Sequence, residues 1–220
     1  MFIILERYGS ALIGGIAVTL QLALIIWIGG LVLGTLLGAW RASLLRSANS
    51  SAVAILALVA SSIPVLVYLL WSYYPLQSLM GISVSPFLTA ASVLTLYNGL
   101  TISELVRGGI ADFPASYRTV ARLNGVPDAV FRRRILLPLV FRSLLPAYLA
   151  SQVTALHLTL FASLISVDEL FRVTQQINAI EYNAVAVFSL LAIFYFILSF
   201  PLLLLSRWAE RHVTPIGLDR

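Results

Sequence analysis

Five long runs of apolar residues, separated by shorter polar stretches, dominate the chain. They are residues 11–40, 52–74, 86–106, 143–167 and 184–206. Each run is long enough to cross a bilayer as a helix, which takes about 20 apolar residues. Backbone groups in hydrocarbon must be hydrogen-bonded within their own segment, and an alternating barrel pattern is absent, so helices are expected. The predicted fold class is all-α, a polytopic membrane protein with five transmembrane helices.

The composition supports a membrane protein. Hydrophobic residues make up 60% of the 220 residues and charged residues only 10%, whereas a soluble domain carries about 25% charged residues. We expect one membrane domain over residues 11–210, an external segment over 1–10 and a tail over 211–220. Because Glu6 and Arg7 interrupt the first ten residues, no cleaved signal peptide is expected.

Several chemistries are excluded by missing residues. The chain has no cysteine, and all fourteen basic residues are arginine, so a thiol nucleophile and a Walker A lysine are absent. The two histidines, His157 and His212, lie on different segments, so no metal site is expected. Hydrolase and metalloprotease motifs are also missing. The chain is therefore predicted not to be an enzyme, and any ATP must be hydrolysed by another chain.

The arginines predict the orientation in the membrane. If the five spans alternate, twelve arginines lie on one side and only Arg7 and Arg172 on the other. This asymmetry places the N-terminus outside and the C-terminus in the cytoplasm, together with the long polar segment 107–142. Because the basic residues flank apolar runs, the net charge of +5 indicates membrane lipid, and no nucleic acid, as the partner.

Small residues and prolines mark packing positions within the spans. Gly30, Gly34 and Gly38 recur every four residues, which favours close approach of a second helix; the alternative is the general abundance of glycine in membrane helices. Pro64 is expected to kink the second span. The neighbouring hydroxyls, Ser61 among them, can line a pathway or cap the freed carbonyls, and the sequence leaves both open.

The cytoplasmic segment 115–138 predicts a helix, a turn and a second helix. Residues 115–123 suit a short helix, Asn124 and Gly125 tolerate the left-handed conformation that ends one, and Pro127 suits the first turn of the next. Apolar residues alternate with arginines, which favours docking of another protein over an ordinary solvated loop. The expected contact residues are Thr119, Val120, Ala121, Arg122, Leu123, Asn124, Gly125, Val126 and Phe131.

This segment resembles the EAA loop of ABC importer permeases, most narrowly those of the polar amino acid family, the histidine, glutamine and arginine type. The resemblance rests on Ala121, Gly125, Phe131, Ile135 and Leu137-Pro138, and on Gly15, Thr19, Leu20, the Pro64 region, Tyr97, Glu104, Arg107-Gly108-Gly109, Pro114, Leu145-Pro146-Ala147 and residues 166–170. It implies a five-helix permease in a bacterial plasma (inner) membrane. The implied partners are a second permease, two cytoplasmic ATPases that hold ATP and Mg²⁺, and an extracytoplasmic substrate-binding protein. No cofactor is implied in this chain.

The chain departs from the family pattern at several polar positions. Thr119 replaces the first Glu of the EAA sequence, with Ser116 and Tyr117 before it, and residues 61–63 replace an Arg-Gly-Thr stretch. In the fourth span, residues 157–161 replace Lys-Asp-Thr-Ser-Leu, and Ala150-Ser151 replace Asn-Glu. These losses predict pairing with a different permease that supplies more of the substrate contacts. The alternative is a homodimer adapted to a less polar ligand.

Polar residues inside spans are expected to face protein or a water-filled cavity. Candidates for the substrate pathway are Ser61, Tyr68, Gln152, His157 and Thr159, although bonding between helices explains His157 equally well. Gln21 and Asn98 are also intramembrane polar residues, and Glu104 is expected to pair with Arg107. The competing functions are a stand-alone secondary transporter or channel and a non-conducting scaffold subunit. Only the ABC interpretation requires an ATPase partner.

Overall fold

The computed structural model describes residues 2–43, 55, 59 and 62–213, and all regular structure in this part of the chain is helical. The long helices are α1 (Phe2–Ser43), α5 (Pro86–Ala111), α8 (Leu137–Leu158) and α10 (Ala184–His212). The shorter elements are α3 (Val65–Trp71), η2 (Ser72–Leu76), α4 (Gln77–Met80), α6 (Ala115–Leu123), α7 (Asp128–Phe131), η3 (Arg132–Leu136), η4 (Thr159–Ile165) and α9 (Leu170–Glu181). The all-helical prediction is confirmed.

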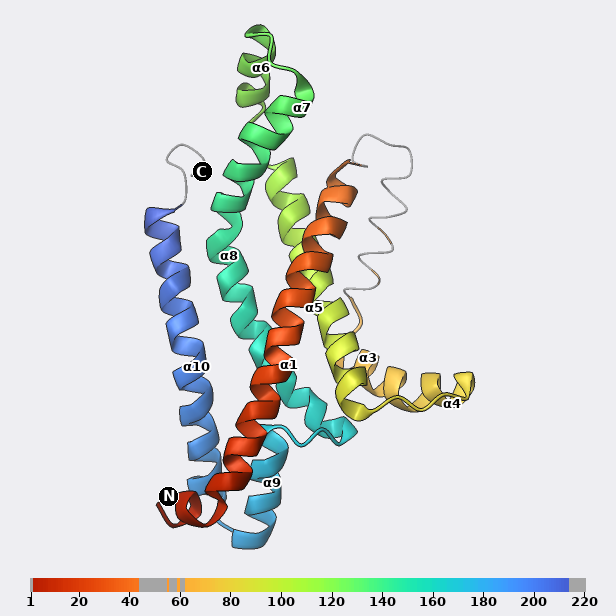
Figure 1. Cartoon of the computed structure of the whole chain (residues 1–220), viewed down its shortest axis with the longest axis vertical. Coiled ribbons are helices and arrows are strands. Elements are labelled where there is room, and N and C mark those ends of the chain that lie inside the picture. The colour runs from red at the N-terminus through yellow and green to blue at the C-terminus, as the bar shows by residue number, and fades with distance from the viewer. Residues whose placement is uncertain (1, 44–54, 56–58, 60–61, 214–220) are drawn as a thin grey trace.

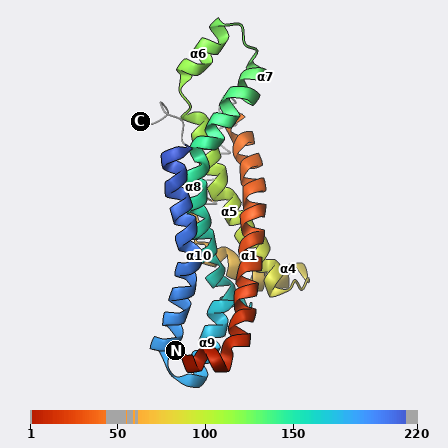
Figure 2. The same cartoon turned by 60° about the vertical axis from the view of Figure 1, so that its left-hand side comes forward.

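The four long helices run side by side along the long axis of the molecule (Figures 1 and 2). Helices α6 and α7 project beyond one end of this bundle, whereas α9 and the start of α1 lie at the other end. The C-terminal ends of α1, α5 and α10 point toward α6 and α7. The described arginines therefore gather at that end, except for Arg7 on the first turns of α1 and Arg172 on α9.

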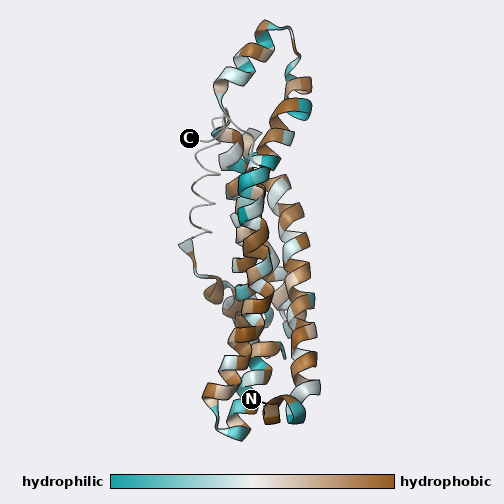
Figure 3. Cartoon of the chain, turned by 90° about the vertical axis from the view of Figure 1, so that its left-hand side faces the viewer, coloured by the Kyte–Doolittle hydropathy of each residue, from teal (hydrophilic) through white to brown (hydrophobic). Residues whose placement is uncertain are grey.

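Three helices of the described residues are long and apolar enough to cross a membrane. They are Phe2–Ala42, Asp128–Ile165 and Ala184–His212. Hydrophobic residues predominate in the middle of the long helices, and hydrophilic residues are more frequent in α6, α7 and at the opposite end (Figure 3). Residues 2–10 of the predicted external segment form the beginning of α1.

Helix α5 is long enough but too polar to be among these three, and several of its polar residues face the protein interior. Asn98 and Ser103 are buried on α5, which packs along α1 more extensively than any other pair of described elements. The glycines of α1 make this close packing possible. A Cβ atom at Gly34 would lie 2.7 Å from the Gly99 carbonyl oxygen, and one at Gly38 would lie 2.7 Å from the Ser103 carbonyl oxygen. At Gly30 a Cβ atom would collide with the side chain of Asn98.

Pro64 begins a helix instead of kinking one. Its backbone is extended, with φ −58° and ψ 138°, and α3 starts at the next residue. The residue before a proline is pushed out of the helical region, so the chain is interrupted at this point. From there α3, η2 and α4 run across the long axis of the bundle (Figure 1). Most of the remainder of the predicted second span, including Ser61, lies outside the described residues.

The helical segment that contains the predicted fourth span begins before it, at Asp128, and changes form within it. Helical structure runs from Asp128 through η3 and α8, so the three arginines at 132–134 are helical. After Leu158 the chain tightens into the 3₁₀ turns of η4, which end at Ser166 in the left-handed conformation, φ 70°. The sequence predicted one uninterrupted helix to residue 167, because apolar composition alone does not distinguish 3₁₀ turns from an α-helix.

Candidate functional site

The turn between α6 and α7 closes with two backbone hydrogen bonds. The Gly125 N–H donates to the Arg122 carbonyl, 3.0 Å away, and the Val126 N–H donates to the Ala121 carbonyl, 2.9 Å away. Gly125 has φ +70°, so its left-handed conformation is confirmed. This pattern is a Schellman motif, which ends a helix sharply and favours a residue without a side chain at the left-handed position. Pro127 precedes the first residue of α7 instead of lying inside it.

The elbow, residues 115–136, packs around an apolar core that it shares with the end of α5 and the start of α8. Phe131 is 2% exposed and packs in a cluster with Ala121, Leu136 and Val140. Its ring lies 6.3 Å from that of Phe113, between the centroids, and the Arg118 guanidinium carbon lies 5.9 Å from the Phe131 centroid. Two of the predicted contact residues, Ala121 and Phe131, are thus directed into the elbow and hold its shape.

The outer surface of the elbow is apolar at its tip and basic around it. Leu123 is 83% exposed, and Val120 and Tyr117 are exposed on the same short helix. A pocket of about 150 Å³ is lined by Arg118, Arg122, Asp128, Phe131 and Arg132. Arg122 reaches Asp128 at 3.4 Å, with both side chains more than half exposed, so this pair contributes little to stability. The elbow therefore offers an apolar tip and a pocket lined by three arginines and one aspartate.

Three other predicted contact residues make local contacts within or next to α6. The Thr119 hydroxyl donates to the Ala115 carbonyl at 3.2 Å, and the Asn124 amide donates to the Val120 carbonyl at 2.8 Å. Val126 is half-buried and packs against the elbow core. These contacts shape the helix end, and Thr119 and Asn124 stay exposed beside Val120, Arg122 and Leu123.

A buried polar network joins α1, α5 and α8 inside the bundle. The Asn98 amide donates to the Ile26 carbonyl at 3.1 Å and lies 3.4 Å from the Gln152 side-chain oxygen. The Trp27 indole N–H donates to the backbone carbonyl of Gln152 at 3.0 Å, and the Gln152 amide nitrogen donates to Ser151 at 2.9 Å. Gln152, a candidate pathway residue, therefore bonds helices together in the core of this subunit.

The other two candidates of the fourth span lie near α10. His157 is exposed on α8, and its Nε2 atom lies 3.1 Å from the Ser199 hydroxyl. Thr159 is buried, donates to the Leu156 carbonyl at 2.7 Å and lies 3.3 Å from the Tyr195 hydroxyl. Thr154, one turn before His157, is also exposed. An exposed imidazole and hydroxyl in the middle of a predicted span are unfavourable against lipid, so this face of α8 is expected to meet protein or water.

Tyr68 lies apart from these residues. It lines a groove of about 510 Å³ between α1, α3 and α5, together with Ser72, Tyr97 and mainly apolar side chains. Helix α3 lies on the opposite side of the bundle from α10 (Figure 1). The structure therefore does not gather the described pathway candidates into one site within a single chain.

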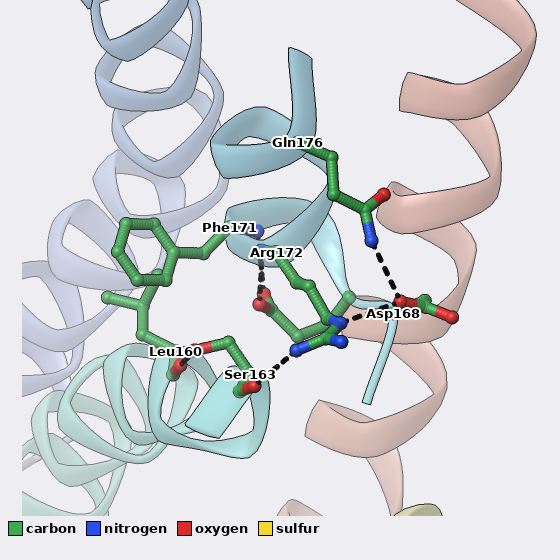
Figure 4. A network of polar contacts seen from close by, with 7 residues as sticks. Leu160, Ser163, Asp168, Phe171, Arg172 and Gln176 are labelled. Atoms are coloured by element: carbon green, nitrogen blue, oxygen red, sulfur yellow. Dashed lines mark hydrogen bonds and ion pairs between the residues drawn. The ribbon is translucent and has the colours of Figure 1, made fainter. Parts of the chain in front are cut away.

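A network of polar contacts fixes the turn between η4 and α9 at the end opposite the elbow (Figure 4). The Arg172 guanidinium donates to Asp168 at 2.9 Å and to the Ser163 carbonyl at 3.0 Å. Glu169 is fully buried and accepts hydrogen bonds from the backbone N–H groups of Phe171 and Arg172, both at 2.8 Å. Burial raises the pKa of the Glu169 carboxyl to about 7, against the lowering effect of these N–H donors.

The Thr19 hydroxyl ties this turn to α1. It accepts the Leu170 N–H at 3.0 Å and donates to the Gly15 carbonyl at 3.0 Å. Residues 166–170 therefore lie beside Gly15 and Thr19. In the sequence, the two segments had in common only that both resemble the family pattern.

A family model matches most of the chain. Residues 30–215 match the model of the binding-protein-dependent transport system inner membrane component. The chain belongs to this family. It is therefore an inner-membrane permease component of an ABC importer, and ATP is bound by a separate ATPase subunit.

Curated relatives and solved structures agree with this assignment. The permease is 28% identical to the glutamine transport system permease protein GlnP of Escherichia coli over 203 residues, 92% of each chain. It is 26% identical to the arginine transport system permease protein ArtQ of Bacillus subtilis over 90% of each chain. An amino acid ABC transporter solved with histidines superposes with a TM-score of 0.86 at 22% identity, covering 96% of this permease and 98% of that chain. The last comparison shows the shared fold.

Sequence reasoning missed several residues of these sites. Tyr117 and Arg118 belong to the elbow surface. Both lie within the predicted short helix 115–123, so the sequence pattern could have indicated them. Thr154 lies three residues before His157, a spacing that places both on one helical face. Arg41, at the end of a long apolar run, is buried, and no sequence pattern indicated its partner.

Proposed function

We propose that this permease imports a polar amino acid or a related small zwitterion, driven by partner ATPases that bind the elbow. The main support is the match of residues 30–215 to the family model, together with relatives whose names specify glutamine, arginine and histidine/lysine/arginine/ornithine transport. Each of those relatives aligns over at least 90% of this chain.

In the proposed topology the chain crosses the membrane five times, with the N-terminus outside and the C-terminus in the cytoplasm. The gathering of described arginines at the elbow end supports this orientation. Helix α5 counts as a span despite its polar residues, because Thr95, Asn98 and Ser103 are buried against α1 and do not face lipid.

The elbow is the proposed contact with the ATPase. Leu123 and Val120 form its apolar tip, and three arginines, Arg118, Arg122 and Arg132, line the pocket of the elbow together with Asp128. An apolar cavity with an acidic rim on the ATPase would complement this surface. When the ATPases close on ATP, movement of the elbow rocks the helices and alternates access to the two sides.

The proposed pathway uses the exposed polar face of α8 around His157 and Thr154. Thr159 and Gln152 are buried and position the helices behind this face, and Tyr68 contributes from the groove on the opposite side of the bundle. An α-amino acid needs donors for its carboxylate and acceptors for its ammonium group, since leaving either unpaired in a dry site costs several kcal/mol. One chain offers few such groups on one face. We therefore propose that a second, different permease completes the site.

Transport by the complete complex tests the substrate class. The permease, its ATPase, its partner permease and the binding protein are reconstituted in vesicles, and ATP-dependent uptake of labelled glutamine, arginine, histidine and a sugar is compared. Uptake of an amino acid supports the proposal, and uptake of the sugar alone contradicts it. Expression of this permease with the ATPase alone tests the pairing, because a stable complex with substrate-stimulated ATP hydrolysis would contradict the heterodimer.

A further inference from the structure

The carboxylate of Glu104, near the elbow end of the bundle, pairs with two arginines from two different helices. The Arg41 Nη2 atom of α1 lies 2.6 Å from Glu104 Oε1 of α5, and the Arg107 Nε atom lies 2.9 Å from Glu104 Oε2. The Glu104–Arg107 pair, expected from the i, i+3 spacing, is confirmed and stays within α5. The Arg41–Glu104 pair, by contrast, joins α5 to α1.

The Arg41 guanidinium is enclosed between the two helices. The residue is 6% exposed, and its Nη1 atom also donates to the Ser103 hydroxyl at 3.0 Å. A buried guanidinium without its carboxylate would be strongly unfavourable, so separating Arg41 from Glu104 is costly. Glu104 itself is partly exposed, which leaves room for Arg107 on its other oxygen.

Backbone contact reinforces this joint. Gly38, one turn before Arg41, has no side chain between its backbone and Ser103, and a Cβ atom there would lie 2.8 Å from the Val106 Cβ atom. The ends of α1 and α5 are therefore held together by close packing and by an enclosed ion pair at the same level.

Helix α5 leads directly into the elbow. After Ala111 only three residues precede α6, and Ile110 and Phe113 pack against the elbow core that contains Phe131. The Phe113 ring also lies 5.3 Å from that of Tyr117, between the centroids. The end of α1 lies beside α5 and away from α6 and α7 (Figure 1). Helix α8 also continues from the elbow, but α1 packs far less extensively on α8 than on α5, so displacement of the elbow reaches α1 mainly through α5.

We propose that the Arg41–Glu104 ion pair transmits movement of the elbow from α5 to α1, and that Arg41 is a positioning residue for ATP-coupled transport. The proposal rests on the proposed function of the elbow as the ATPase contact. Without this pair, α5 follows the ATPase while the cytoplasmic end of α1 lags behind, so that ATP hydrolysis continues and fewer substrate molecules cross per ATP.

The two arginines on Glu104 provide a matched comparison. Arg41→Gln removes the bond between helices and leaves Glu104 paired with Arg107, whereas Arg107→Gln removes the bond within α5 and leaves the joint intact. Both variants are assembled in the complete complex, and substrate transported per ATP hydrolysed is measured in vesicles. We expect this ratio to fall about tenfold in Arg41→Gln and to change by less than about twofold in Arg107→Gln. Arg41→Lys, which keeps the charge but not the simultaneous contacts of the guanidinium, should give an intermediate ratio.

Equal ratios in the Arg41→Gln and Arg107→Gln complexes would overturn the inference. If Arg41→Gln does not assemble, the double variant Arg41→Met/Glu104→Gln leaves no unpaired buried charge at this position and should show the same loss of coupling. A normal ratio in that double variant would also overturn the inference. A wild-type complex that imports no substrate with ATP would instead contradict the proposed function.

Discussion

The backbone N–H of Val126 donates a hydrogen bond to the carbonyl of Ala121, 2.9 Å away, across the left-handed turn at Gly125. This bond turns the chain back on itself and brings α7 beside α6. As a result Phe131 reaches the elbow core and Leu123 stays at the tip. The shape of the surface proposed to meet the ATPase therefore depends on a single glycine conformation.

Gly125→Val is expected to uncouple the permease. A β-branched residue in the left-handed region costs about 1–2 kcal/mol, which distorts the turn while the membrane helices remain folded. Substrate-stimulated ATP hydrolysis of the assembled complex should fall. Gly108→Ala is the control, because Gly108 is helical and a Cβ atom there would meet no atom within 4 Å. Equal activity in both variants would argue against a role for the turn.

Leu123 and Phe131 should respond differently to truncation. Leu123→Ala removes an exposed side chain, so it should weaken binding of the ATPase by about 1–2 kcal/mol without changing the melting temperature of the permease. Phe131→Ala empties a buried site and should lower stability by about 3–5 kcal/mol. Titration of the ATPase against each variant and thermal unfolding in detergent measure the two effects. A Leu123→Ala permease that binds the ATPase normally would place the contact elsewhere.

Gly34→Ala is expected to separate α1 from α5. The added Cβ atom would lie 2.6 Å from the Ile102 Cβ atom and 2.7 Å from the Gly99 carbonyl oxygen, and overpacking of this kind costs about 1–3 kcal/mol. Gly14→Ala, on the same helix with no atom within 4 Å of the new Cβ, serves as the control. Thermal unfolding in detergent should show a loss for Gly34→Ala only; equal melting temperatures would contradict the packing.

Glu169 should make stability depend on pH. Burial raises the pKa of its carboxyl from 4.5 to about 7, so the folded protein binds a proton that the unfolded chain has already released. This contribution to stability is complete below about pH 4.5 and is lost as the pH rises toward 7. Glu169→Gln keeps an oxygen to accept the N–H bonds but cannot titrate. The melting temperature of the wild type should therefore fall relative to the variant over that range, and parallel curves would refute the assignment.

The elbow was predictable from sequence because its signals are local. Asn124 and Gly125 end one helix and Pro127 precedes the next, and each of these preferences acts within a few residues. The inward direction of Phe131 was not predictable, because it depends on Phe113 and Leu136 packing around the ring. An exposed and a buried aromatic residue look alike in a short amphipathic segment.

The partners of intramembrane polar residues were also beyond the sequence. Asn98 and Gln152 are far apart along the chain, and their contact depends on the packing of α1, α5 and α8. The same holds for Arg41, whose carboxylate lies on another helix. Polarity showed that such residues need partners, but only the tertiary arrangement distinguishes a bond between helices from a contact with substrate.

The central claim is that this permease moves substrate only when a partner ATPase hydrolyses ATP. The most direct test compares vesicles that contain the complete complex with vesicles that contain this chain alone. Labelled amino acid uptake should require ATP on the ATPase side of the complete complex, and it should be absent from the chain alone under sodium or proton gradients. Uptake by the chain alone, driven by an ion gradient without ATP, would contradict the account.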